Sequence, residues 1–190
     1  MKSEKLLKVL EETGAIMNGH FLLTSGRHSD RYIEKFRVLE NPDSLDKVTK
    51  AMADSYQDKN IELVLGAAIG GILIAGGVGR HLGVKHIFSE RVDGKMKFRR
   101  GFELPKGTRV LIVEDIITTG GSVFELIKLA QEYEAEIVGV VNLVERAPEK
   151  IDFGVPSKAL LHLPSVSWEQ SDCPLCKSNN PMTQRGRTGK

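Results

Sequence analysis

The chain has 190 residues, 41% of them hydrophobic, which is enough to bury the core of one domain with small additions. Its 27 Lys and Arg against 25 Asp and Glu give a net charge of +2, which argues against a general nucleic-acid surface. No apolar run approaches the roughly 20 residues of a membrane span, and the amino end has the pattern of an amphipathic helix, not of a secretory signal. These features predict a cytoplasmic protein of one domain, residues 1–190, without nucleic-acid or membrane partners.

The first 60 residues contain two predicted helices and a turn between them. Apolar spacing predicts a helix over residues 2–13 that stops at Gly14, and a second helix from Pro42 to about residue 57. Short apolar runs on either side of residues 24–27 predict a hairpin or a bent strand. The donors of this turn could hold a small anion, although a solvated hairpin tip is the more usual role of such a turn.

Continuous apolar runs predict buried strands further along the chain, at residues 61–65, 84–90, 110–113, 137–144 and 158–163. Helical spacing follows two of them, after Gly71 and after Phe124. This alternation of strands and helices predicts an α/β fold, a Rossmann-like parallel sheet with helices on both faces.

The stretch 109–123 passes from an apolar strand into the acidic pair Glu114-Asp115 and then into a turn that opens a helix. The turn is Ile116-Ile117-Thr118-Thr119-Gly120-Gly121-Ser122. Glycines let a ligand approach the backbone, and the free N–H groups of a helix's first turn attract an anion. An ordinary strand-to-helix turn has similar residues, but two adjacent acids repel unless something neutralises them. The combination predicts a phosphate cradle with carboxylates for the hydroxyls of a phosphorylated sugar.

The pair Gly70-Gly71 repeats this arrangement after the strand at 61–65. Parallel strands joined by helices bring such turns to one edge of the sheet, so both turns should face one crevice. The ligand would then carry phosphate at both ends. A dinucleotide site is disfavoured because the Gly-x-Gly-x-x-Gly spacing is not met from Gly66 onward.

Residues 91–102 crowd five basic residues around two glycines. They predict a mobile basic flap that can close over a polyphosphate. The alternative is a solvated hairpin whose charges protect a sheet edge from aggregation. Arg146, just past the strand at 137–144, is placed either to meet a ligand carboxylate or carbonyl, or to form a salt bridge with a neighbouring glutamate.

Cys173 and Cys176 are the only cysteines, too few for a disulfide framework. Two thiolates could supply half of a structural zinc site, with the rest from a second subunit, or they could form a redox pair. We favour the interpretation that they are two thiols without partners in a tail. Residues from about 181 to the end are expected to form a flexible tail.

Val113 to Ser122 resembles the motif with which type I phosphoribosyltransferases bind 5-phosphoribosyl-1-diphosphate. This motif is long and far more specific than a glycine-rich turn alone. Residues 21–29 and the flap are similar to the orotate-specific branch of that family, and residues 90–102, 152–156 and 173–176 to its Thermus-like members. The resemblance covers roughly residues 10–180. It implies a type I phosphoribosyltransferase fold with a hood from about 1–40 and 145–180.

The resemblance also implies an activity, in which the 5-phosphoribosyl group passes to orotate to give orotidine 5'-phosphate and diphosphate in de novo pyrimidine biosynthesis. Mg²⁺ would be the cofactor, held by the substrate and not directly by the protein. A homodimer is implied, because in this family the flap serves the neighbouring subunit's site.

Roles carry over from the family motif residue by residue. The resemblance implies that Glu114 and Asp115 hold the ribose hydroxyls and that Thr118 to Ser122 grip the 5-phosphate. Ile116 and Ile117 belong to the same implied site for phosphoribosyl diphosphate, and Gly70-Gly71 would lie against the diphosphate. The implied catalytic residues are Arg91, Lys95, Lys97 and Asp115. The implied orotate ligands are Thr118, Arg146, Thr24, Ser25, Gly26 and Arg27.

Some positions depart from the orotate-specific pattern. Thr24 and Gly70 stand where many members have a lysine, and Tyr32-Ile33 replaces an aromatic pair. Two alternatives therefore stay open, a purine phosphoribosyltransferase of salvage and a non-catalytic regulator that senses phosphoribosyl diphosphate.

Overall fold

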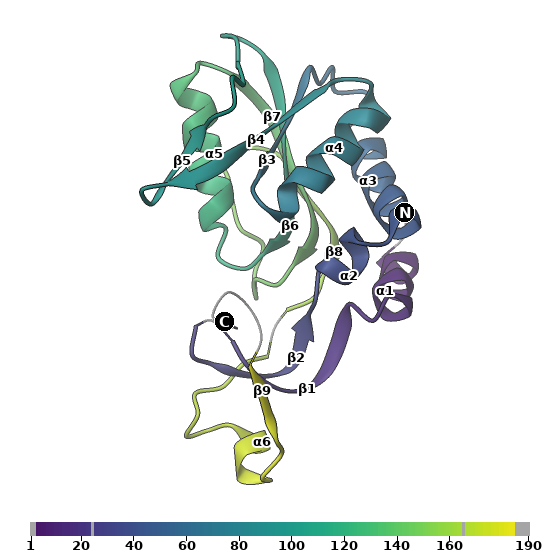
Figure 1. Cartoon of the computed structure of the whole chain (residues 1–190), viewed down its shortest axis with the longest axis vertical. Helices are drawn as coiled ribbons and strands as arrows, with labels where there is room; N and C mark the ends of the chain where they lie inside the picture. Colours follow the sequence, from purple (N-terminus) through teal and green to yellow (C-terminus); the bar gives the residue numbers. More distant parts are fainter. Residues whose placement is uncertain (1–2, 24, 165, 185–190) are drawn as a thin grey trace.

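The computed structural model describes residues 3–23, 25–164 and 166–184. Its main sheet has six strands in the order β5-β4-β3-β6-β7-β8 (Figure 1). Five strands are parallel and β5 is antiparallel at one edge. The strands are β3 (Leu63–Ala67), β4 (Lys85–Val92), β5 (Lys95–Phe98), β6 (Arg109–Ile117), β7 (Glu136–Glu145) and β8 (Ser157–His162).

Helices cover both faces of this sheet (Figure 1). One face packs against α1 (Ser3–Glu12), α2 (Phe36–Leu39), α3 (Pro42–Asp54) and α4 (Gly70–Leu82). The other face packs against α5 (Gly121–Glu132). The predicted α/β architecture is confirmed. No helix in the described ranges is long and apolar enough to cross a bilayer.

The central strand β6 is apolar at successive positions because it is buried on both faces of the sheet. Leu111 and Val113 enter the core beneath α3 and α4, whereas Val110 and Ile112 enter the core beneath α5. All four side chains are completely buried. Since successive side chains of a strand point to opposite faces, a strand covered on both sides must be apolar at every position.

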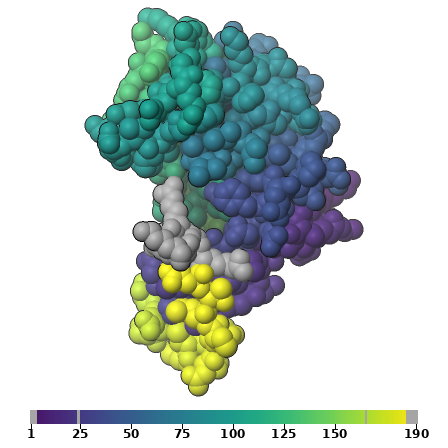
Figure 2. Space-filling model, viewed as in Figure 1, coloured from purple at the N-terminus to yellow at the C-terminus, as the bar shows by residue number. Residues whose placement is uncertain are grey.

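A second, smaller sheet lies beyond the carboxyl ends of the parallel strands (Figure 1). Its strand β1 (Ile16–Leu22) pairs antiparallel with β2 (His28–Ile33) and parallel with β9 (Met182–Gln184). The short helix α6 (Pro174–Lys177) lies at its outer end. We call residues 16–33 and 166–184 the hood, and the rest of the described chain the sheet lobe; the hood projects as the narrower part in Figure 2.

The hood differs from the expected one at its amino end. Helix α1 contributes Leu6 and Leu10 to the core of the sheet lobe, so the residues before β1 do not belong to the hood. The helix itself has the predicted extent, and Gly14 beyond it takes a left-handed φ of 68°.

The expectations for the carboxyl-terminal segment need correction. Met182–Gln184 form strand β9 beside β1, so a tail does not begin at residue 181; residues 185–190 lie outside the described residues. All three residues of β9 are exposed, and an exposed edge strand leaves no apolar pattern in the sequence. The cysteines are not thiols without partners either, because the Sγ atom of Cys173 lies 3.6 Å from Nε2 of His20.

Candidate active site

A cavity of about 240 Å³ opens at the carboxyl end of β6. The predicted turn forms most of its wall, since every residue from Ile116 to Ser122 lines it together with Glu114. Arg91, Val123 and Glu125 complete the lining. The structure therefore brings the predicted cradle and one of its two carboxylates together in one cavity.

Two glycines shape the turn in different ways. Gly120 has a left-handed φ of 78°, and a Cβ atom there would lie only 2.9 Å from the ring of Phe153. Gly121 is exposed, and the nearest atom to its missing Cβ is Oγ1 of Thr119 at 3.8 Å. The backbone at the start of α5 is thus open to a ligand, where the first N–H groups of a helix have no partner within the helix.

Asp115 follows Glu114 on β6, and its side chain is almost completely buried. Its Oδ1 atom accepts a hydrogen bond from the N–H of Ile116 at 2.6 Å. Its Oδ2 atom forms an ion pair with Nζ of Lys35, also at 2.6 Å. Lys35 supplies the neutralising charge that the acidic pair requires. It precedes Asp115 by 80 residues and follows no local motif, so the sequence offered no signal for it.

Glu114 is also buried, and its Oε1 atom accepts a hydrogen bond from the N–H of Asp115 at 2.9 Å. Burial and, secondly, the negative charge of Asp115 raise the pKa of Glu114 from its ordinary value to about 7. The positive charge of Lys35 opposes this shift. Near neutral pH the cavity therefore contains a carboxyl group close to its own midpoint of ionisation.

The two glycine turns meet at one edge of the sheet, as predicted. A Cβ atom on Gly70 would overlap Oδ2 of Asp115, so only glycine permits the start of α4 to lie this close to β6. Gly71 has a packing role, because its carbonyl group lies against Gly66 of β3. Both glycines are buried and neither lines the cavity within the described part of the chain. The preceding Ala68–Ile69 peptide bond is cis.

The basic segment forms a hairpin that continues the sheet edge. Strands β4 and β5 are joined at Asp93-Gly94, whose left-handed φ angles of 51° and 78° suit a tight hairpin turn. Arg91 reaches the cavity and forms an ion pair with Glu125 of α5 at 2.9 Å. Lys95 and Lys97 are exposed, and neither lines this cavity or the cavity beside Arg146.

Arg146 lies beside a second cavity of about 60 Å³. Its backbone N–H donates to the carbonyl of Ile117 at 2.8 Å, which places this cavity next to the first. Burial lowers the pKa of the Arg146 guanidinium. The lining residues are Asp30, Arg31, Ile33, Arg146, Leu163, Pro164 and Val166. The contribution of Asp30 and Arg31 was not predicted, because polar residues in a short strand give no periodic signal.

The predicted orotate turn lies at the tip of the β1–β2 hairpin. The guanidinium of Arg27 donates to Oγ of Ser167 at 2.9 Å and to the Ser167 carbonyl at 2.7 Å, and it also pairs with Glu169. Ser25, Gly26 and Arg27 line neither cavity. Thr24 lies outside the described residues.

Known proteins agree with this geometry. The phosphoribosyl transferase domain matches residues 37–153, which include both glycine turns. The orotate phosphoribosyltransferase of Caldanaerobacter subterraneus is 44% identical over 186 residues, and the match covers 98% of each chain. This chain belongs to the orotate phosphoribosyltransferase family. The orotate phosphoribosyltransferase of Thermotoga maritima is 43% identical over 96% of this chain and 97% of its own.

Solved structures show the same fold. The orotate phosphoribosyltransferase of Aeropyrum pernix superposes with a TM-score of 0.67 at 26% identity, over 83% of this chain and 93% of its own. An adenine phosphoribosyltransferase from Rhodothermus marinus has a TM-score of 0.62 at 23% identity, over 84% of this chain and 99% of its own, and shows the fold alone. The family resemblance read from the sequence and the prediction of a transferase are thus confirmed.

Proposed function

We propose that this member of the orotate phosphoribosyltransferase family transfers the 5-phosphoribosyl group of 5-phosphoribosyl-1-diphosphate to orotate, in de novo pyrimidine biosynthesis. The products are orotidine 5'-phosphate and diphosphate. The observation that carries the proposal is the cavity walled by Glu114 and the whole turn from Ile116 to Ser122, beside the buried ion pair of Asp115. The family match over nearly the full chain supports it.

The turn is suited to the 5-phosphate. Its exposed residues Thr118, Thr119 and Ser122 offer hydroxyl donors, and the open backbone at Gly121 adds N–H donors at the positive end of α5. Glu114, in its ionised form, would accept hydrogen bonds from the ribose hydroxyls, with Asp115 beside it. Gly70 and Gly71 would face the diphosphate from the start of α4.

Mg²⁺ fits this donor set if the substrate supplies most of its ligands. The carboxylate of Glu114 lines the cavity next to the turn and could bind the ion. Both carboxylate oxygens of Asp115 are already engaged, one by the N–H of Ile116 and the other by Lys35. Mg²⁺ is commonly held by one or two carboxylates plus substrate phosphates and waters. When bound, it would neutralise charge on the departing diphosphate.

The reaction breaks the bond between ribose C1 and the diphosphate oxygen, and diphosphate leaves with the electron pair. A bond forms from C1 to a ring nitrogen of orotate, which releases its proton to solvent. No protein nucleophile is needed, so the protein's contribution is positioning and charge stabilisation. Arg146, with a fork suited to a carboxylate, and Thr118 would hold orotate, with the Ser25–Arg27 turn closing the base site. Arg91 would stabilise the leaving diphosphate.

Lys95 and Lys97 act on a different cavity in this proposal. Both are exposed on the β4–β5 hairpin, and neither lines the cavity at β6 or the cavity beside Arg146. In a homodimer the hairpin would present them to the partner's diphosphate site. Mixing a Lys95→Ala, Lys97→Ala chain with a Glu114→Ala chain should restore part of the activity that each loses alone, if the hairpin works across the dimer.

The test of the reaction is a set of assays on the purified protein with Mg²⁺, phosphoribosyl diphosphate and, separately, orotate, uracil, adenine, hypoxanthine or xanthine. We expect diphosphate release with orotate only. Release with a purine instead would overturn the choice of base. Binding of phosphoribosyl diphosphate without release for any base would show a sensor and not a transferase.

A further inference from the structure

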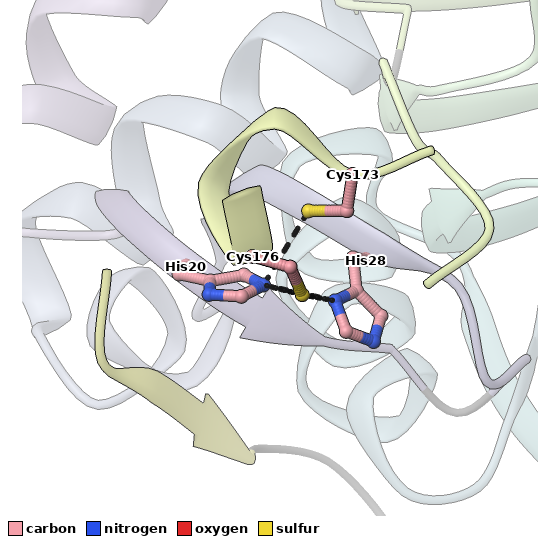
Figure 3. A group of neighbouring side chains, drawn as sticks. All are labelled: His20, His28, Cys173 and Cys176. Carbon is pink, nitrogen blue, oxygen red and sulfur yellow. Dashed lines mark hydrogen bonds between the residues drawn. The ribbon is translucent and has the colours of Figure 1, made fainter. Parts of the chain in front are cut away.

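Four side chains that can bind a metal meet inside the hood (Figure 3). His20 comes from β1 and His28 from β2, while Cys173 precedes α6 and Cys176 lies within it. One potential ligand atom from each side chain lies within 4.8 Å of every other. Cys173 and both histidines are buried, and Cys176 is half-buried.

The separations match those of a tetrahedral zinc site. Zn–S bonds of about 2.3 Å and Zn–N bonds of about 2.0–2.1 Å place neighbouring N and S ligands about 3.6 Å apart and two N ligands about 3.3 Å apart. The Sγ atom of Cys173 lies 3.6 Å from Nε2 of His20, and that of Cys176 lies 3.7 Å from the same nitrogen and 3.3 Å from Nδ1 of His28. The two nitrogens are 2.9 Å apart. These four separations depart from the tetrahedral values by about 0.4 Å or less.

The surroundings of His20 direct a lone pair to this centre. Its Nδ1 atom lies 2.9 Å from the carbonyl of Asn180, which can only accept, so Nδ1 carries the proton. Its Nε2 atom then presents one lone pair, toward which His28, Cys173 and Cys176 all converge. One lone pair cannot accept three hydrogen bonds, whereas it can ligate one cation that the other three atoms share. A carbonyl that fixes the ligand's tautomer is a common companion of metal-bound histidine.

The carboxyl-terminal segment of the hood has no apolar core of its own. Of residues 166–184, Cys173 is the one buried residue. The segment otherwise attaches to the β1–β2 hairpin by the pairing of β9 with β1 and by polar contacts. These include the backbone pair His28–Trp168 and the bond from Oγ of Ser29 to the carbonyl of Val166 at 2.8 Å. A segment without an apolar core of its own needs a covalent or metal cross-link.

We propose that the hood binds one structural Zn²⁺ through Nε2 of His20, Nδ1 of His28 and the Sγ atoms of Cys173 and Cys176. The four protein ligands close the coordination shell, so the ion has no open position for catalysis. Both thiols lose their protons to solvent when the ion binds. All four ligands come from one chain, so no second subunit is needed. The ion would hold in place the segments that carry Asp30 and Val166, two residues that line the Arg146 cavity. The zinc proposal does not depend on the proposed reaction.

The first test measures metal in the wild-type protein, purified without chelator and under reducing conditions. We expect about one zinc per chain by plasma mass spectrometry. After replacement by Co²⁺, the visible spectrum should show the bands of tetrahedral cobalt with thiolate ligands. These measurements do not depend on whether any variant folds.

Variants then locate the ion. His20→Ala and Cys176→Ser should each lower zinc content at least tenfold, whereas His86→Ala, which changes an exposed histidine of β4, should retain it. Wild-type protein that holds no zinc and takes up none when Zn²⁺ is added would overturn the proposal. Iron or nickel in place of zinc, a Cys173–Cys176 disulfide in the reduced preparation, or full zinc in Cys176→Ser would do the same.

Discussion

The sheet lobe and the hood are stabilised in different ways. The sheet lobe buries apolar side chains on both faces of β6, and its two cores contain most of the buried residues. In the hood the buried side chains are mainly polar or sulfur-containing, namely His20, His28, Ser29 and Cys173. A three-stranded sheet without a covering layer cannot bury enough apolar surface, so a metal cross-link takes the place of a core.

The two regions also differ in how their sites are assembled. The cavity at the end of β6 is lined mostly by Glu114 and residues 116–123, because a strand, a turn and a helix start follow one another. The zinc ligands come from opposite ends of the chain, with Cys173 lying 153 positions after His20. Local structure therefore creates the first site, whereas the second requires the hood to be folded already.

Removal of the metal should destabilise the hood far more than the sheet lobe. With a chelator present, we expect amide protection to be lost in residues 16–33 and 166–184 and retained in β6, because structural zinc contributes folding energy directly to the segment it ties. Hydrogen exchange followed by mass spectrometry measures both regions in one sample. Equal loss of protection in the two regions would contradict the inference that the metal stabilises the hood and not the sheet lobe.

Gly70→Ala should be the most damaging single change at the junction of the two glycine turns. The new methyl group must displace Asp115 from Lys35, and we expect kcat/KM to fall about 10³-fold through loss of site geometry. Gly76→Ala is a matched control in the same helix. Its Cβ would lie 3.5 Å from His86, an ordinary contact, so activity should stay near that of the wild type. Similar losses in both variants would show a general effect on α4.

Glu114 should make the sheet lobe less stable as pH rises. Its folded pKa of about 7 exceeds its ordinary value of 4.5, so between these values the folded protein holds a proton that the unfolded chain has lost. The free energy of unfolding should then fall between about pH 4.5 and 7, by as much as about 3 kcal/mol. Urea unfolding across this range should show a shallower fall for Glu114→Gln. Identical pH profiles would rule out Glu114 as the source.

Arg91→Ala should reduce turnover and leave the fold intact. We expect kcat to fall about 10²-fold because a cation at the diphosphate is lost. The free energy of unfolding should change by less than about 1 kcal/mol, since the ion pair with Glu125 is partly exposed. Arg37→Ala, which removes an exposed pair with Glu40 on α2, is the control and should leave kcat unchanged. Near-normal turnover of Arg91→Ala would remove Arg91 from the mechanism.

The sequence by itself determined the α/β fold and the phosphate turn. Both depend on patterns that lie within one short stretch, such as the apolar run at 110–113 and the acidic pair before Gly120-Gly121. Their physical causes, burial of a strand on two faces and the backbone freedom of glycine, act between neighbours in the chain.

Only the tertiary structure decided which side chains contact Asp115 and the two cysteines. Lys35 neutralises Asp115 across 80 residues, and two histidines from a hairpin meet two cysteines near the other end of the chain. Contacts of this kind depend on where separate elements are brought by the fold, and a charge or a thiol carries no sequence signal for a distant partner. For the same reason the cysteines were interpreted as thiols without partners, and the exposed strand β9 was not predicted.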